Sequence, residues 1–109
     1  MQRMGMVIGV NPDQVATYKR LHEAVWSEVL DLISRCNIRN YTIFLREPEN
    51  LLFGTWEYHG TDFEADMARM AADARNQEWW SLTIPCQRPL ETRAEGEWWA
   101  RMEEVFHHD

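Results

Sequence analysis

Residues 3–14, Arg-Met-Gly-Met-Val-Ile-Gly-Val-Asn-Pro-Asp-Gln, decide the fold, because they join a strand pattern directly to a helix start. The large apolar residues fall at every second position, at Met4, Met6, Ile8 and Val10. A period of two predicts a strand with one strongly apolar face. Asn11 can cap the helix that follows, Pro12 suits its first position, and Gln14 stands where a capping box needs Glu or Gln. The sequence therefore predicts a strand that leads at once into a helix.

This helix is expected to continue to about Arg35, with Asn37 as a left-handed residue just beyond its end. Its predicted inner face consists of Val15, Tyr18, His22, Trp26, Val29 and Ile33. Tyr18, His22 and Trp26 stand four residues apart and would form one column on that face. A phenol, an imidazole and an indole together are unusual material for a hydrophobic core.

The rest of the chain predicts a hairpin, two helical segments and a last strand. The expected elements are strands at 40–45 and 51–58, a helix from about 60, a helical segment from about 73, and a strand at 98–106. This order predicts an α+β, ferredoxin-like βαββαβ fold with an antiparallel sheet, in a single domain spanning residues 1–109. Helices would cover one face of the sheet, and a second copy is the simplest cover for the other. We therefore expect a symmetric homodimer whose sheets pack face to face.

The composition narrows the choice of partners and location. Acidic residues outnumber basic ones, 18 to 11, for a net charge of −7, which argues against a nucleic-acid partner. The sequence has neither an apolar run long enough to span a membrane nor a signal-peptide pattern. Cys36 and Cys86 lie far apart without a motif and are expected to be reduced thiols. These observations predict a cytoplasmic protein with no membrane partner.

The sequence contains no pattern typical of a metal site or of a nucleotide-binding site. The run His107-His108-Asp109 offers ligand types, but adjacent strand residues point in opposite directions, and a frayed terminus explains the run more simply. Spacings such as HxH, HExxH, phosphate loops and a dinucleotide-binding fingerprint do not occur. We therefore expect no metal and no cofactor.

His22 is the candidate for chemistry, with simple core packing as the alternative. Tyr18 lies one turn away, Tyr41 lies on a strand against which the helix could pack, and the Trp79-Trp80 pair sits on a segment without a clear amphipathic pattern. Aromatic faces stack on the C–H faces of sugars, and phenol or imidazole groups bind hydroxyls. Because imidazole exchanges protons near neutral pH, this set favours acid–base chemistry on a small polyol.

Several motifs together resemble the L-rhamnose mutarotase family. They are Val10-Asn11-Pro12-Asp13, Tyr18-x-Arg20-x-His22-x-x-x-Trp26-x-Glu28, Arg39-Asn40-Tyr41-x-Ile43-x-Leu45, Asn50-Leu51-Leu52-Phe53, Trp79-Trp80 and Glu104-Val105-Phe106. The resemblance covers nearly the whole chain. It implies a dimeric ferredoxin-like α/β barrel, an enzyme that interconverts the anomers of a 6-deoxyhexose without a cofactor. By motif, His22 matches the proton donor, and Tyr18, Tyr41, Trp79 and Trp80 match the sugar-binding positions.

One segment departs from the family pattern. Residues 82–99 add Trp98, Trp99 and several charges after the tryptophan pair, which leaves L-fucose as an alternative to L-rhamnose. Two other functions remain open at this stage: a dimeric α/β barrel monooxygenase, and a non-enzymatic module that binds a small ligand. The fold alone does not distinguish them.

Overall fold

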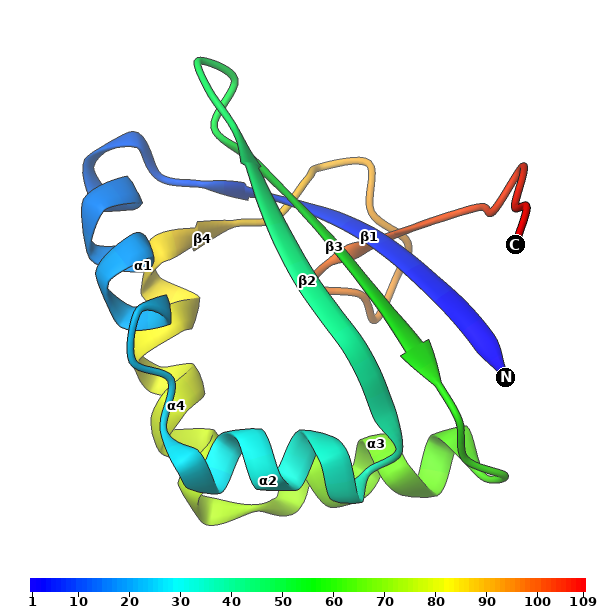
Figure 1. The fold of residues 1–109 in the computed structure, drawn as a ribbon. Coiled ribbons are helices and arrows are strands. Elements are labelled where there is room, and N and C mark those ends of the chain that lie inside the picture. Colours follow the sequence, from blue (N-terminus) through cyan, green and yellow to red (C-terminus); the bar gives the residue numbers. More distant parts are fainter.

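The computed structural model describes residues 1–109 and places β1 (Gln2–Val10) inside a curled antiparallel sheet (Figure 1). The strand order is β2 (Ile38–Arg46), β3 (Leu51–Tyr58), β1 and β4 (Gln87–Arg88). Because Met4, Met6, Ile8 and Val10 are all buried, the two-residue period of β1 corresponds to one core-facing side. The predicted α+β fold with an antiparallel sheet is confirmed.

The edge of the sheet beside β1 differs from the prediction of one strand at 98–106. Two short strands share it: β4 pairs with Gly9 and Val10, and β5 (Ala100–Met102) pairs with residues 5–7. Pro89 has no N–H with which to continue the ladder from β4. Beyond Met102 the chain leaves the sheet, and residues 103–109 are exposed and form no strand. The last strand is three residues long.

All helices lie on one face of the sheet (Figure 1). They are α1 (Val15–His22), α2 (Ser27–Arg35), α3 (Phe63–Ala72) and α4 (Ala74–Thr83), with short 3₁₀ turns at Pro12–Gln14 and Ile84–Cys86. Figure 1 shows α1 and α4 together along one side, and α2 with α3 along an adjoining side. Asp62 and Asp73 cap α3 and α4 by accepting hydrogen bonds from main-chain N–H groups.

The prediction of one helix as far as Arg35 is wrong, because the chain breaks between α1 and α2. Trp26 has an extended backbone (φ −60°, ψ 138°), so its side chain leaves the column that holds Tyr18 and His22. Its indole instead packs edge-on against Trp79 of α4, with ring centroids 5.3 Å apart. The bend lets two short helices follow the curled sheet, where one straight helix would leave it.

The predicted capping box is also wrong, although the helix start is in place. Asn11 makes no side-chain cap, and its amide donates to the main-chain oxygen of Pro85. Gln14 accepts a weak hydrogen bond from the Cys86 thiol. Both side chains therefore tie the helix start to the turn before β4. The left-handed conformation predicted for Asn37 is confirmed (φ 68°).

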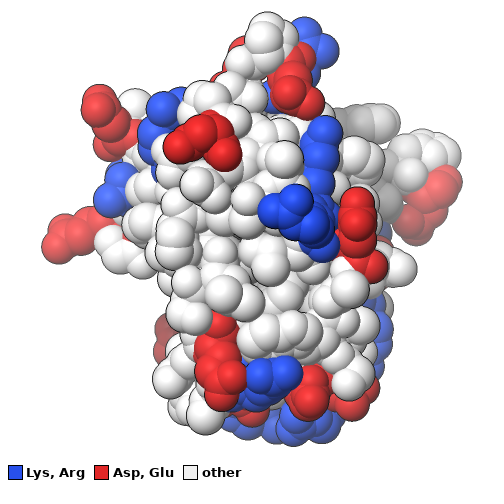
Figure 2. Space-filling view, turned by 90° about the vertical axis from the view of Figure 1, so that its left-hand side faces the viewer, with Lys and Arg blue, Asp and Glu red and all other residues white.

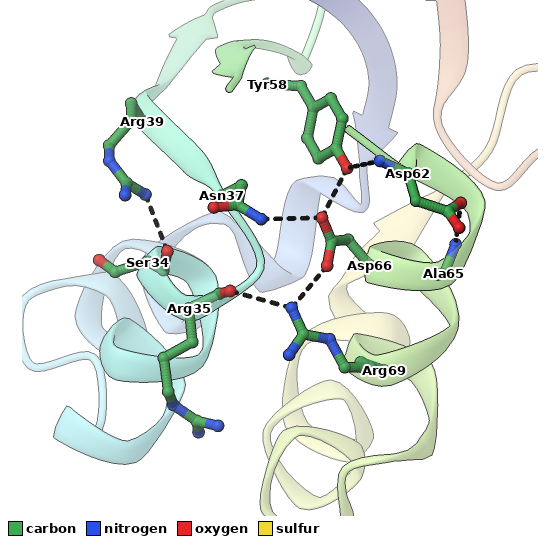
Figure 3. Close-up of polar contacts among 9 residues, drawn as sticks. All are labelled: Ser34, Arg35, Asn37, Arg39, Tyr58, Asp62, Ala65, Asp66 and Arg69. Atoms are coloured by element: carbon green, nitrogen blue, oxygen red, sulfur yellow. Dashed lines mark hydrogen bonds and ion pairs between the residues drawn. The ribbon is translucent and has the colours of Figure 1, made fainter. Parts of the chain in front are cut away.

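A buried carboxylate fastens the far end of β3 to the helices (Figure 3). Asp66 of α3 accepts hydrogen bonds from the Tyr58 hydroxyl, the Asn37 amide and the Arg69 guanidinium. These three donors lower the pKa of Asp66 to about 2. Gly60 is required beside this cluster, because a Cβ there would lie 2.4 Å from the Tyr58 hydroxyl.

The outer face of the sheet carries a partly exposed apolar row. The strand register aligns Phe44, Phe53 and Val7 on three strands, and the row ends at Ala100, which is buried. Phe44 is 60% exposed, and Met102, in the neighbouring row, is 42% exposed. Over α1 and α4, Figure 2 shows basic and acidic side chains interspersed around a broad uncharged area. None of the helices is both long and apolar enough to span a membrane.

Candidate active site

A cavity of about 860 Å³ lies between the helices and the inner face of the sheet. Its wall is mostly apolar and includes all five residues singled out from the sequence: Tyr18, His22, Tyr41, Trp79 and Trp80. A smaller adjoining cavity of about 370 Å³ shares Tyr18, His22 and Ile43 with it. The structure thus brings together residues from α1, β2 and α4 that lie up to 62 positions apart in the sequence.

His22 is the last residue of α1, and only one of its two ring nitrogens makes a hydrogen bond within the protein. Its Nδ1 atom lies 2.8 Å from the main-chain oxygen of Tyr18. A carbonyl oxygen can only accept, so Nδ1 carries the proton and Nε2 keeps its lone pair in the neutral ring. Nε2 makes no hydrogen bond within the protein. The ring can therefore take up a proton at Nε2 and give it back without losing its anchor.

A series of aromatic contacts fixes the plane of the His22 ring. Tyr18 stacks on the ring at 4.3 Å between centroids, and Trp79 meets it edge-on at 5.5 Å. Behind Trp79 lies Trp26, whose outer face is covered by the Arg75 guanidinium at 3.6 Å. Of the two rings against His22, Trp79 therefore rests on a second layer made by Trp26, at the start of α2, and Arg75 of α4.

The remaining lining residues provide hydrogen-bonding groups and one fixed charge. The phenol of Tyr41 lines the cavity from β2, and desolvation raises its pKa to about 12, so it is protonated at neutral pH. Arg39 is the one formally charged lining residue. Its guanidinium donates to the main-chain oxygen of Ser34 (Figure 3) and also to that of Ile38. Among the lining side chains, His22 is the only imidazole, the type of group best suited to both accept and donate a proton.

Sequence reasoning missed several polar residues of the wall, among them Gln87, and left the role of two tryptophans open. Gln87 on β4 is buried and lines the cavity together with Trp98 and Trp99. Its two-residue strand has no alternation that could be read from the sequence. The Trp98-Trp99 pair was a visible signal, but only the short β5 that follows it brings the pair to the cavity. No group of three or more His, Cys, Asp or Glu side chains is placed to hold a metal ion.

Comparison with known proteins places this arrangement in a family. The family model for L-rhamnose mutarotase matches residues 3–108. An L-rhamnose mutarotase from Oceanobacillus iheyensis is 30% identical over the full length of both chains. The chain belongs to the L-rhamnose mutarotase family. An L-rhamnose mutarotase from Yersinia pestis is 38% identical over 80 residues, which cover 73% of this chain and 74% of the relative.

Solved structures support the same fold. The crystal structure of an L-rhamnose mutarotase from Formosa agariphila superposes with a TM-score of 0.78 at 22% identity, with both chains covered completely. Tetracenomycin F2 cyclase from Streptomyces glaucescens, a type-II polyketide cyclase, superposes with a TM-score of 0.68 at 16% identity over all of this chain and 98% of its own. The mutarotase fold is thus shared with a protein of different activity, and function must be argued from the site.

Proposed function

We propose that this protein is an L-rhamnose mutarotase in which His22 moves the protons. The observation that best supports this proposal is the geometry of His22 in the cavity. Its Nδ1 atom lies 2.8 Å from a carbonyl oxygen, and its Nε2 atom is free. The chain that holds this histidine belongs to the mutarotase family. Acid–base catalysis requires a group that both takes and returns a proton near neutral pH. An imidazole held in one tautomer meets that requirement.

The reaction exchanges the two anomers through the open-chain aldehyde. Nε2 of His22 takes the proton of the anomeric hydroxyl as the bond between C1 and the ring oxygen breaks. The electron pair of that bond stays on the ring oxygen, which receives a proton from the imidazolium. Rotation about the C1–C2 bond and the reverse steps close the ring on the other face of C1. No atom or electron is gained or lost, so the chemistry needs only protons.

The cavity wall suits a 6-deoxyhexose. Trp79 and Trp80 supply aromatic surface for the C–H face of the pyranose, and the hydroxyls of Tyr18 and Tyr41 bind its polar side. The mostly apolar lining favours a methyl group at C6, where most hexoses carry a hydroxyl. These properties support a 6-deoxyhexose, and the family match favours L-rhamnose, with L-fucose as the second sugar.

Saturation-transfer NMR on the anomeric protons tests this proposal. L-Rhamnose and L-mannose are a matched pair, because they differ only by the hydroxyl at C6. We expect the protein to accelerate anomer exchange of L-rhamnose, and to accelerate that of L-mannose less. L-Fucose in the same series tests the second sugar. If none of these sugars exchanges faster with protein than without it, the proposed function is wrong.

The family match does not favour the alternatives, a monooxygenase of the same fold or a non-enzymatic ligand-binding module. A barrel monooxygenase would bind an extended or planar substrate, and a bound coloured ligand would reveal it. Because we propose a sugar as the substrate, the purified protein should be colourless and should carry no bound chromophore.

A homodimer is part of the proposal. The partly exposed apolar row of Phe44, Phe53 and Val7 on the outer sheet face is the supporting feature. A contiguous apolar patch of this kind typically marks an interaction surface, and a two-fold dimer is the commonest way to bury it. A cytoplasmic location is also proposed, because Cys36 and Cys86 are buried free thiols, as is usual in a reducing compartment.

A further inference from the structure

We infer that Gln87 is a positioning residue that directs the hydroxyl proton of Tyr18 toward the sugar; this inference rests on the proposed function. Gln87 pairs with Val10 at the end of β1, so its side chain shares the inner face of the sheet with that of Val10. It is only 9% exposed and forms part of the cavity wall. An apolar side chain could also fill this buried position, so a polar amide here needs a partner to orient.

The first contact of the amide fixes which way round it lies. The Trp98 indole nitrogen donates to Oε1 of Gln87 at 2.7 Å. An indole N–H is a donor with no acceptor capacity, so the atom that faces it must be the amide oxygen. The amide nitrogen of Gln87 is thereby turned to the opposite side, toward α1.

The second contact passes this direction on to Tyr18. Nε2 of Gln87 lies 3.5 Å from the Tyr18 hydroxyl oxygen, a long hydrogen bond in which nitrogen can only donate. The hydroxyl oxygen therefore acts as the acceptor and its own proton remains available. Gln87 is the one protein partner of this hydroxyl. The hydrogen bonds therefore all run in one direction, from Trp98 to Gln87 and from Gln87 to Tyr18. The O–H group of Tyr18 is left as a donor at the cavity.

Burial keeps that donor in its protonated form. The Tyr18 side chain is 6% exposed, and desolvation raises the pKa of its phenol well above the ordinary value of 10.0. Because Tyr18 also stacks on His22 at 4.3 Å, the donor lies next to the group that exchanges protons. A sugar oxygen that accepts from Tyr18 would therefore be placed within reach of the imidazole.

The most informative variant is Gln87→Glu, which keeps the size and reverses the polarity. A carboxylate accepts from both Trp98 and Tyr18, so the Tyr18 proton turns away from the sugar. We expect L-rhamnose exchange at pH 7.5 to fall on the order of tenfold, the effect of one hydrogen bond. The activity of Gln87→Glu relative to that of the unaltered protein should rise as the pH falls, because the protonated carboxyl can again donate to Tyr18. Gln2→Glu, which adds the same charge at an exposed position, is the matched control.

A double variant separates this role from simple packing. In a Tyr18→Phe background the hydroxyl is gone, so adding Gln87→Glu should change the exchange rate by less than about twofold. If Gln87→Glu does not fold, Trp98→Phe carries the test, because it removes only the N–H that orients the amide. Its loss should likewise vanish in the Tyr18→Phe background.

Three results would overturn the inference. The first is full activity of Gln87→Glu, or of Trp98→Phe if Gln87→Glu does not fold. The second is a loss of exchange activity that persists unchanged in the Tyr18→Phe background. The third is a relative activity of Gln87→Glu that does not depend on pH. A protein that exchanges no sugar at all would instead remove the proposed function, and the inference with it.

Discussion

Nδ1 of His22 lies 2.8 Å from the main-chain oxygen of Tyr18, one helical turn earlier in α1. Residue 18 thus acts on the imidazole twice, through its carbonyl group and through its ring, which stacks at 4.3 Å. The carbonyl sets the tautomer and the stacking sets the ring plane. A histidine constrained in both ways keeps Nε2 in one place for proton transfer.

The first prediction concerns Trp26, which supports Trp79 from behind. Trp26→Ala should raise the KM for L-rhamnose several-fold with little change in kcat, because aromatic pairs contribute about 0.5–1.5 kcal/mol and Trp79 would lose its partner. Trp26→Phe should restore most of the affinity. Steady-state exchange rates measured at increasing sugar concentrations would separate the two constants. An unaltered KM in Trp26→Ala would show that Trp79 needs no support from α2.

The second prediction concerns the acid stability that Asp66 provides. Because the folded-state pKa of Asp66 is about 2, below the ordinary 3.8, folding favours its charged form. This contribution to stability is fully present above pH 3.8 and is lost as the pH falls from there to about 2. Asp66→Asn should lower the urea midpoint at pH 7 and reduce the dependence of that midpoint on pH in the same window.

Asp31→Asn is the control for that experiment, because Asp31 is an exposed carboxylate of α2. It should leave both the midpoint and its pH dependence close to those of the unaltered protein. Similar behaviour of the two variants would show that the hydrogen bonds that Asp66 accepts from Tyr58, Asn37 and Arg69 (Figure 3) do not stabilise the fold.

The elements formed by strong periodicity could be predicted from the sequence, as could five of the residues that line the cavity. Alternation in β1 and the four-residue spacing of Tyr18 and His22 both arise from local geometry, and burial of one face is enough to fix them. The break before Trp26 could not be predicted, because it depends on packing against Trp79, 53 residues later in the sequence. Gln87 was missed for the same reason: its partners Tyr18 and Trp98 meet only in the folded chain.

The third prediction tests the outer sheet face. Light scattering with size exclusion should give a mass of about 26 kDa, twice the 13.0 kDa of the chain. Phe44→Glu should shift this mass toward that of the monomer, because it puts a charge into the partly exposed apolar row. Leu82→Glu is the control, since Leu82 is a similarly exposed apolar residue on α4, on the helical side. A monomer before any substitution would refute the dimer.

The most direct test of the central role of His22 is the exchange rate between the two anomers of L-rhamnose with His22→Ala. His59→Ala is the matched control, because His59 is an exposed histidine that bonds to Glu57, outside the cavity. Saturation transfer between the anomeric protons should show that His22→Ala slows the catalysed exchange by about 10²–10⁴-fold, with the fold intact by circular dichroism. His59→Ala should exchange at the unaltered rate. If folded His22→Ala also exchanged at the unaltered rate, His22 would be a packing residue and the proposed proton transfer would be wrong.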